Sequence, residues 1–175
     1  MAKFFGNLHL VLAVGLLASF AIMFSVDADG VTAQSITGLL YYFNFVQIPT
    51  MPKIPAELKP GVSKHIAPSA LFFFRWGALM TVVFGLIVSI QAGYGHQALM
   101  LDENYLLIGI GMWLALIMAF NVWFIIWPNQ KKALGIVEAD DATKAKAAST
   151  AMMTSRLNTL LSIPMLYTMV TFNGG

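Results

Sequence analysis

The chain contains no cysteine, and charged residues make up only 10% of its 175 residues. The absence of cysteine excludes disulfides, cysteine-ligated zinc, iron–sulfur clusters and a c-type haem attached through a C-x-x-C-H motif. A soluble domain carries about 25% charged residues, whereas 58% of this chain is hydrophobic. The net charge of +2 is too small to indicate nucleic-acid binding. The composition indicates an all-α integral membrane protein, and the length allows a single domain, 1–175.

Five apolar stretches are candidates for membrane-spanning helices. They lie at about residues 5–26, 31–48, 67–90, 105–127 and 151–172. About 20 residues are needed to cross a ~30 Å hydrocarbon core as a helix, and four of the stretches reach that length. The second is shorter and carries several polar residues, among them Gln34 and Asn44.

The charges favour all five spans. If the chain has five spans, every lysine and arginine falls on the same side of the membrane as the N-terminus, most of them in or near the first loop or the 128–150 segment. The opposite side holds Asp27, Asp29, Asp102 and Glu103. Basic residues concentrate on the cytoplasmic side of membrane proteins. We therefore expect a five-helix bundle with a cytoplasmic N-terminus and an external C-terminus, in the inner membrane if the host is a bacterium. We expect the first stretch to be a retained span rather than a signal peptide, because no A-x-A-like cleavage site follows it.

Proline and glycine predict where these helices are interrupted. Four prolines within residues 49–60 predict an irregular first loop, and Pro128 is expected to end the fourth span. Residues 139–163 contain neither glycine nor proline, which predicts a cytoplasmic helix that runs directly into the fifth span. An Asp140–Lys144 pair would support this helix, and Pro164 would kink it.

Polar residues inside the predicted spans share one depth. Counted at a rise of 1.5 Å per residue, they lie about 6–12 Å from the cytoplasmic ends; the candidates are Asn44, Arg75, Asn121, Arg156 and Asn158. Polar groups inside a membrane are costly and mark functional sites. One interpretation is a pocket open to the cytoplasm in which Arg75 and Arg156 hold an anion or a polar ring. The alternative is hydrogen bonding between helices, with arginines that reach the lipid headgroups.

Histidines offer a second kind of site. His9 and His65 lie on the same side of the membrane and are the candidate axial ligands of a b-type haem, although no pair of histidines on one helix supports it. We expect no metal site, because no carboxylate lies at that depth. Gly109 and Gly111 are expected to allow close helix packing.

Four segments carry a family resemblance. They are Gly38–Gln47, Phe74–Leu79, Asn121–Lys132 and Ser155–Leu166. In this order they resemble the membrane (N-terminal) domain of bacterial urate hydroxylase, the cytochrome-c-linked urate oxidase. The resemblance implies a membrane-embedded helical bundle, urate chemistry and cytochrome c as electron acceptor. Two features depart from the family: this chain carries no cytochrome c domain, and the histidine expected near the start of the second span is missing.

Three functions are compatible with these observations. The first is a structural or cofactor-holding subunit that associates with larger membrane subunits of an oxidoreductase or electron-transport complex. The second is a membrane enzyme that oxidises urate or a related purine and passes electrons to a separate cytochrome c. The third is a quinone-binding or transport protein. The sequence leaves open whether the chain has catalytic activity of its own.

Overall fold

The computed structural model describes residues 38–174, which belong to a compact unit spanning Thr32–Gly175. The predicted first span and residues 31–37 of the second lie outside the described residues. Most of the residues that the structure describes lie in helices, and none of them lies in a strand. This confirms the all-α fold, whereas the number of spans and the placement of the termini stay predictions.

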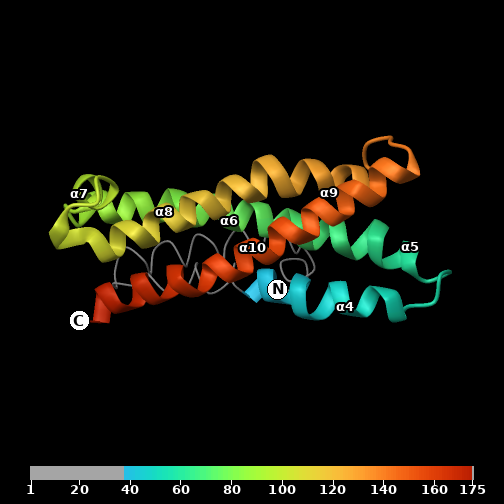
Figure 1. Cartoon of the computed structure of the whole chain (residues 1–175), viewed down its shortest axis with the longest axis horizontal. Coiled ribbons are helices and arrows are strands. Elements are labelled where there is room, and N and C mark those ends of the chain that lie inside the picture. Colours follow the sequence, from blue (N-terminus) through green and yellow to red (C-terminus); the bar gives the residue numbers. More distant parts are fainter. Residues whose placement is uncertain (1–37, 175) are drawn as a thin grey trace, which may run out of the picture. The chain divides into compact units, whose positions relative to one another are not determined.

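Four helical stretches follow one another along the described chain (Figure 1). Their elements are η1 (Tyr42–Gln47), α4 (Ile48–Thr50) and η2 (Met51–Lys53); α5 (Lys59–Gly61), η3 (Val62–Ile66) and α6 (Ala67–Gln91); η4 (Glu103–Tyr105), α8 (Leu106–Phe120), η5 (Asn121–Ile126) and α9 (Trp127–Ala133); and α10 (Asp141–Gly174). A short helix, α7 (Gly95–Leu99), joins the second stretch to the third. The η elements are turns of π- or 3₁₀-helix.

Two of these stretches are long and apolar enough to cross a membrane. They are Lys59–Gln91 and Glu103–Ala133, whose most apolar 18-residue windows have mean hydropathies of 2.0 and 2.1. They contain the predicted third and fourth spans and extend beyond both. The predicted fifth span lies within α10, a single helix of 34 residues. This confirms that one helix runs from the 139–150 region directly into that stretch.

Three π-helical segments each end two residues before a proline. They are η1, η3 and η5, followed by Pro49, Pro68 and Pro128. A proline ring collides with the carbonyl four residues earlier in an α-helix. A π-turn adds a residue and moves that carbonyl away, so the helix continues. The prediction that Pro128 ends the fourth span is therefore wrong. The prediction of an irregular first loop holds only for residues 54–58.

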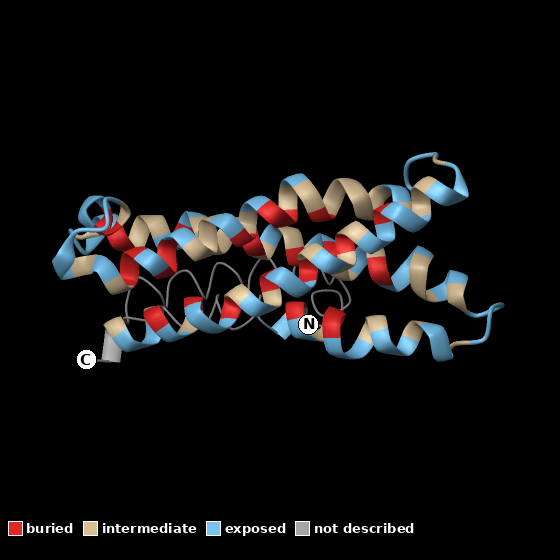
Figure 2. Ribbon diagram, in the orientation of Figure 1, coloured by how far each residue is buried: buried red, intermediate tan, exposed pale blue. Residues whose placement is uncertain are grey.

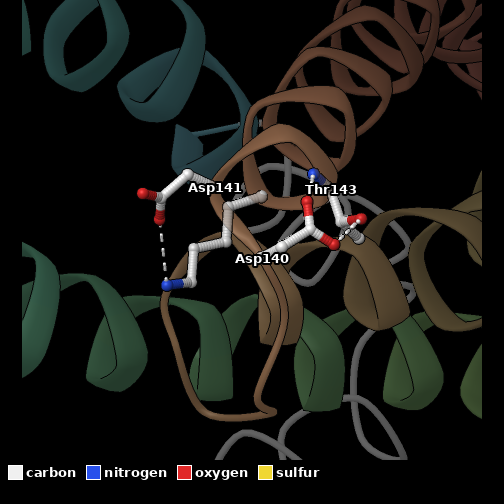
Figure 3. A network of polar contacts seen from close by, with 4 residues as sticks. Asp140, Asp141 and Thr143 are labelled. Atoms are coloured by element: carbon white, nitrogen blue, oxygen red, sulfur yellow. Dashed lines mark hydrogen bonds and ion pairs between the residues drawn. The ribbon is translucent and has the colours of Figure 1, made fainter.

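The start of α10 depends on one carboxylate (Figure 3). Asp140 accepts hydrogen bonds from the backbone N–H of Thr143 at 2.8 Å and from its hydroxyl at 2.7 Å. These bonds hold the pKa of Asp140 below its usual value, as expected for a carboxylate that caps a helix. The predicted Asp140–Lys144 ion pair is wrong, because Lys144 pairs with Asp141 at 3.5 Å.

A seam of small and polar residues lies along α10 (Figure 2). Its buried members recur at intervals of three and four residues: Ala147, Ala151, Ser155, Asn158, Ser162, Met165 and Thr168. The seam packs against α8, η5 and α9. Apolar side chains from the other helices surround it, among them Leu40, Phe74 and Val122. Small residues allow helix backbones to approach closely, as in membrane bundles.

Gly109 and Gly111 mark the closest approaches to α8. A Cβ atom on Gly109 would collide with the carbonyl oxygen of Ala98 in α7, and one on Gly111 would lie 2.6 Å from the Thr168 hydroxyl. The prediction of close packing at this glycine pair is confirmed.

We expect Gly109→Ala to lower the free energy of unfolding by about 1–3 kcal/mol, as overpacking does in other cores, because a backbone carbonyl cannot move aside cheaply. Gly111→Ala should cost less, since a side chain can rotate away. Gly85→Ala is the control, because nothing lies within 4 Å of its added Cβ. Thermal unfolding in detergent tests this order, and equal losses at Gly85 and Gly109 would contradict it.

Candidate functional site

Two buried asparagines link α10 to the end of α8. The Nδ2 of Asn121, the first residue of η5, donates to the Oδ1 of Asn158 at 2.8 Å. The Nδ2 of Asn158 donates to the backbone carbonyl of Met118 at 3.0 Å. Asn121 is 7% exposed and Asn158 only 1%. Since these amides satisfy each other, they act here as a link between helices.

A third buried asparagine links α10 to η1. The Nδ2 of Asn44 donates to the Ser155 hydroxyl at 2.8 Å and to the Leu40 carbonyl at 3.0 Å. Ser155 and Asn158 are three residues apart and therefore face the same side of α10. The Oδ1 of Asn44, however, is buried without a hydrogen-bond partner. This oxygen is an acceptor that remains available.

Arg75 projects from α6 onto the helix formed by η5 and α9. Its guanidinium carbon lies 3.3 Å from the centroid of the Trp127 ring. The Lys131 ammonium lies 5.7 Å from the same ring. The neighbouring Trp76 and Trp123 rings meet edge to face, with centroids 5.8 Å apart. Cations over a tryptophan face are attracted by its π-electrons, so Trp127 stabilises the charge of the Arg75 guanidinium.

The charge of Arg75 has no carboxylate partner among the described residues. The one ion pair in that part of the chain joins Lys144 to Asp141. The Nη1 of Arg75 is buried and has no hydrogen-bond acceptor. Buried polar groups are paired in the great majority of cases. The site therefore presents an unsatisfied cationic donor beside a flat aromatic ring.

A comparison with protein families decides what these helices belong to. The family model described as urate oxidase N-terminal matches residues 73–173, more than half of the chain. The chain belongs to the urate oxidase N-terminal family. A comparison with curated proteins found no match, and neither did a comparison with solved structures. Three of the four segments that carried the resemblance lie within or across this match, and Gly38–Gln47 precedes it.

Arg156 lies on the exposed side of α10 in this urate oxidase N-terminal domain, because it lies between the inward-facing positions Ser155 and Asn158. The pocket in which Arg75 and Arg156 together hold a ligand stays a prediction. Whether the asparagines or either arginine contacts a ligand stays a prediction.

The described histidines do not form a haem site. His65 is exposed in η3, and His96 is exposed in α7. The 25 residues of α6 separate the two, a distance of about 37 Å at 1.5 Å per residue. His9 lies outside the described residues, so the His9–His65 pair stays a prediction. No group of three or more His, Asp or Glu side chains gathers in the described part to hold a metal ion.

A small cavity lies between α6, α8 and α10 next to the asparagine link. Its volume is about 40 Å³, and its lining is apolar except for Asn158 and Thr81. Ligand pockets for small molecules measure about 300–1,000 Å³, so this cavity has room only for water-sized molecules. Arg75 and Trp127 do not line this cavity and are themselves only half-buried.

The sequence did not single out Trp123, Gln130, Gln47 and Thr81. Each has a buried polar side-chain atom without a partner. The spacing of residues 123, 127 and 130, which is that of one helix face, was the signal that could have identified two of them.

We expect Asn158→Leu to lower the free energy of unfolding by about 1–3 kcal/mol, because it leaves the Asn121 amide buried without its partner. The double variant Asn121→Leu/Asn158→Leu should lose less than the sum of the two single variants, since it removes both polar groups together. Unfolding in detergent provides the measurement. Strictly additive losses would show that the amides do not depend on each other.

Proposed function

We propose that this chain is an integral membrane protein whose helical bundle binds an anionic, carbonyl-bearing ring at Arg75, and that it forms the membrane part of an oxidoreductase. Membership of the urate oxidase N-terminal family supports the proposal. So do two helices apolar enough to cross a membrane, and the many large apolar side chains that the bundle exposes, such as Phe45, Phe124 and Leu160. Lipid would cover such side chains in a bilayer.

The observation that carries the proposal is the unpartnered Nη1 of Arg75. A charged group within a bilayer is costly unless something compensates it. Hydrogen bonds to charged groups are stronger than those between neutral groups. An anion or a carbonyl oxygen supplied by a ligand would provide the missing acceptor, while Trp127 offers a flat surface beside it.

Urate has the chemistry that such a site requires. It is planar, carries ring carbonyls and is an anion at neutral pH. In the proposed function, Arg75 neutralises and orients the ring. Electrons removed from it pass to a separate acceptor, with cytochrome c as the partner that the family resemblance implies.

Arg75→Ala is expected to weaken urate binding to the purified protein in lipid nanodiscs by about tenfold to a hundredfold, the range of one lost hydrogen bond to a charged group. Arg75→Lys should bind with intermediate affinity, because it keeps the charge but loses the planar stack. Equilibrium dialysis with labelled urate provides the measurement.

Arg156→Ala is the matched control, since it removes the other arginine from an exposed position. Its urate affinity should stay within about twofold of the original protein. Wild-type protein that binds no urate or related oxopurine would contradict the proposed site.

A second candidate function is a structural subunit, and the outer face of α10 favours it. Met153, Leu160, Tyr167 and Val170 are each about two-thirds exposed and lie along one side of the helix. Lipid or a helix of a larger subunit would cover this face. Gentle solubilisation from native membranes should then yield a stoichiometric complex, whereas a lone monomer that oxidises urate would contradict it.

A further inference from the structure

The face of η5 and α9 that meets Arg75 carries more than one unpaired polar atom. Trp127 stacks under the Arg75 guanidinium, and Trp123 contacts the neighbouring Trp76. Both contacts show that this face of the helix is turned toward α6. Trp123 lies about one helical turn before Trp127, and Gln130 lies about one turn beyond it.

Three buried atoms of this face and of Arg75 lack hydrogen-bond partners. They are the Nη1 of Arg75, the Nε1 of Trp123 and the Oε1 of Gln130. The first two can only donate a hydrogen bond, whereas the third can only accept one. The set therefore complements a ligand that offers two acceptors and one N–H donor.

Some amide and indole groups in this structure are paired, although Gln47 elsewhere in the chain also has an unpaired buried oxygen. Asn129, next to Gln130, donates its Nδ2 to the Ile125 carbonyl at 2.8 Å. Trp113 donates its Nε1 to the Leu99 carbonyl at 3.0 Å. Helix carbonyls can thus accept from amide N–H and indole N–H groups in this bundle, whereas the Trp123 indole beside Arg75 has no such acceptor and the Gln130 oxygen has no donor.

We propose that Trp123 and Gln130 determine the specificity of the Arg75 site, an inference that rests on the proposed function. Together with Arg75 they recognise a cyclic amide edge, in which ring carbonyls accept from Nη1 and Nε1 and a ring N–H donates to Oε1. Oxopurines carry such an edge. Quinones carry only acceptors, so they leave Gln130 Oε1 without a partner, and an unpaired buried acceptor disfavours binding.

The test measures the affinities of wild-type protein and variants in nanodiscs for labelled urate and for a short-chain ubiquinone. Trp123→Phe removes the indole donor but keeps an aromatic ring, and Gln130→Met removes the acceptor at similar size. Each should weaken urate binding about threefold to tenfold, the range of one lost neutral hydrogen bond. Gln130→Met should leave ubiquinone binding unchanged or strengthen it, which lowers the preference for urate.

Two controls separate recognition from folding. Trp76→Phe alters the exposed ring that packs against Trp123. Asn129→Ala removes the paired amide next to Gln130. Both variants should keep the wild-type preference for urate over ubiquinone. A variant that only disturbs the bundle would weaken both ligands together. Such a parallel loss in Gln130→Met would overturn the inference, whereas Trp123→Phe removes a donor that the carbonyls of both ligands can use.

The remaining outcomes distinguish this inference from the proposed function. If Arg75→Ala loses urate while Trp123→Phe and Gln130→Met bind it normally, the cyclic-amide edge is wrong and the Arg75 site stands. If ubiquinone binds more tightly than urate through Arg75, the inference is likewise overturned. Wild-type protein that binds no oxopurine would overturn both.

Discussion

The hydrogen bonds that the seam of α10 makes to two other helices hold the site in place. Asn158 joins α10 to α8 and η5 through Asn121 and the Met118 carbonyl, and Ser155 joins it to η1 through Asn44. Lipid tails are as apolar as a leucine side chain, so a membrane bundle gains little from apolar contacts alone and depends on close packing and polar links. Because η5 continues into α9, the same links set the position of Trp123, Trp127 and Gln130 opposite α6.

The π-turns and the polar links belong to one arrangement. Asn44 lies within η1 and Asn121 begins η5, and both segments precede a proline that an uninterrupted α-helix would not accommodate. A π-turn changes the direction in which the following residues face. Pro49 and Pro128 lie outside the seam of α10. Through the π-turns before them, these two prolines nevertheless affect which side chains reach α10 and α6.

Part of this site could be predicted from the sequence, and the rest could not, for physical reasons. Depth along the predicted spans selected Asn44, Asn121 and Asn158, and the structure buries all three on α10 or against it. Depth alone also selected Arg156, because the depth of a residue in the membrane carries no information on which way its side chain faces. Trp123 and Gln130 were missed because their importance arises from atoms left unpaired after packing.

The continuation of the helix through Pro128 was missed because a proline in the sequence is compatible both with a helix end and with a π-turn. The single helix leading into residues 151–172 followed correctly from the absence of glycine and proline.

Solid-state NMR of the arginine side chains tests the central claim most directly. The chain has two arginines, Arg75 and Arg156, so Arg156→Lys leaves one guanidinium to observe. Protein with ¹⁵N-labelled arginine in lipid bilayers would be loaded with ¹³C-labelled urate, and the dipolar coupling between the two labels measured. The account predicts a coupling between the Arg75 guanidinium nitrogens and a urate carbonyl carbon at hydrogen-bonding range. Bound urate without any such coupling would contradict it, because the unpartnered Nη1 would then have no role in holding the ligand.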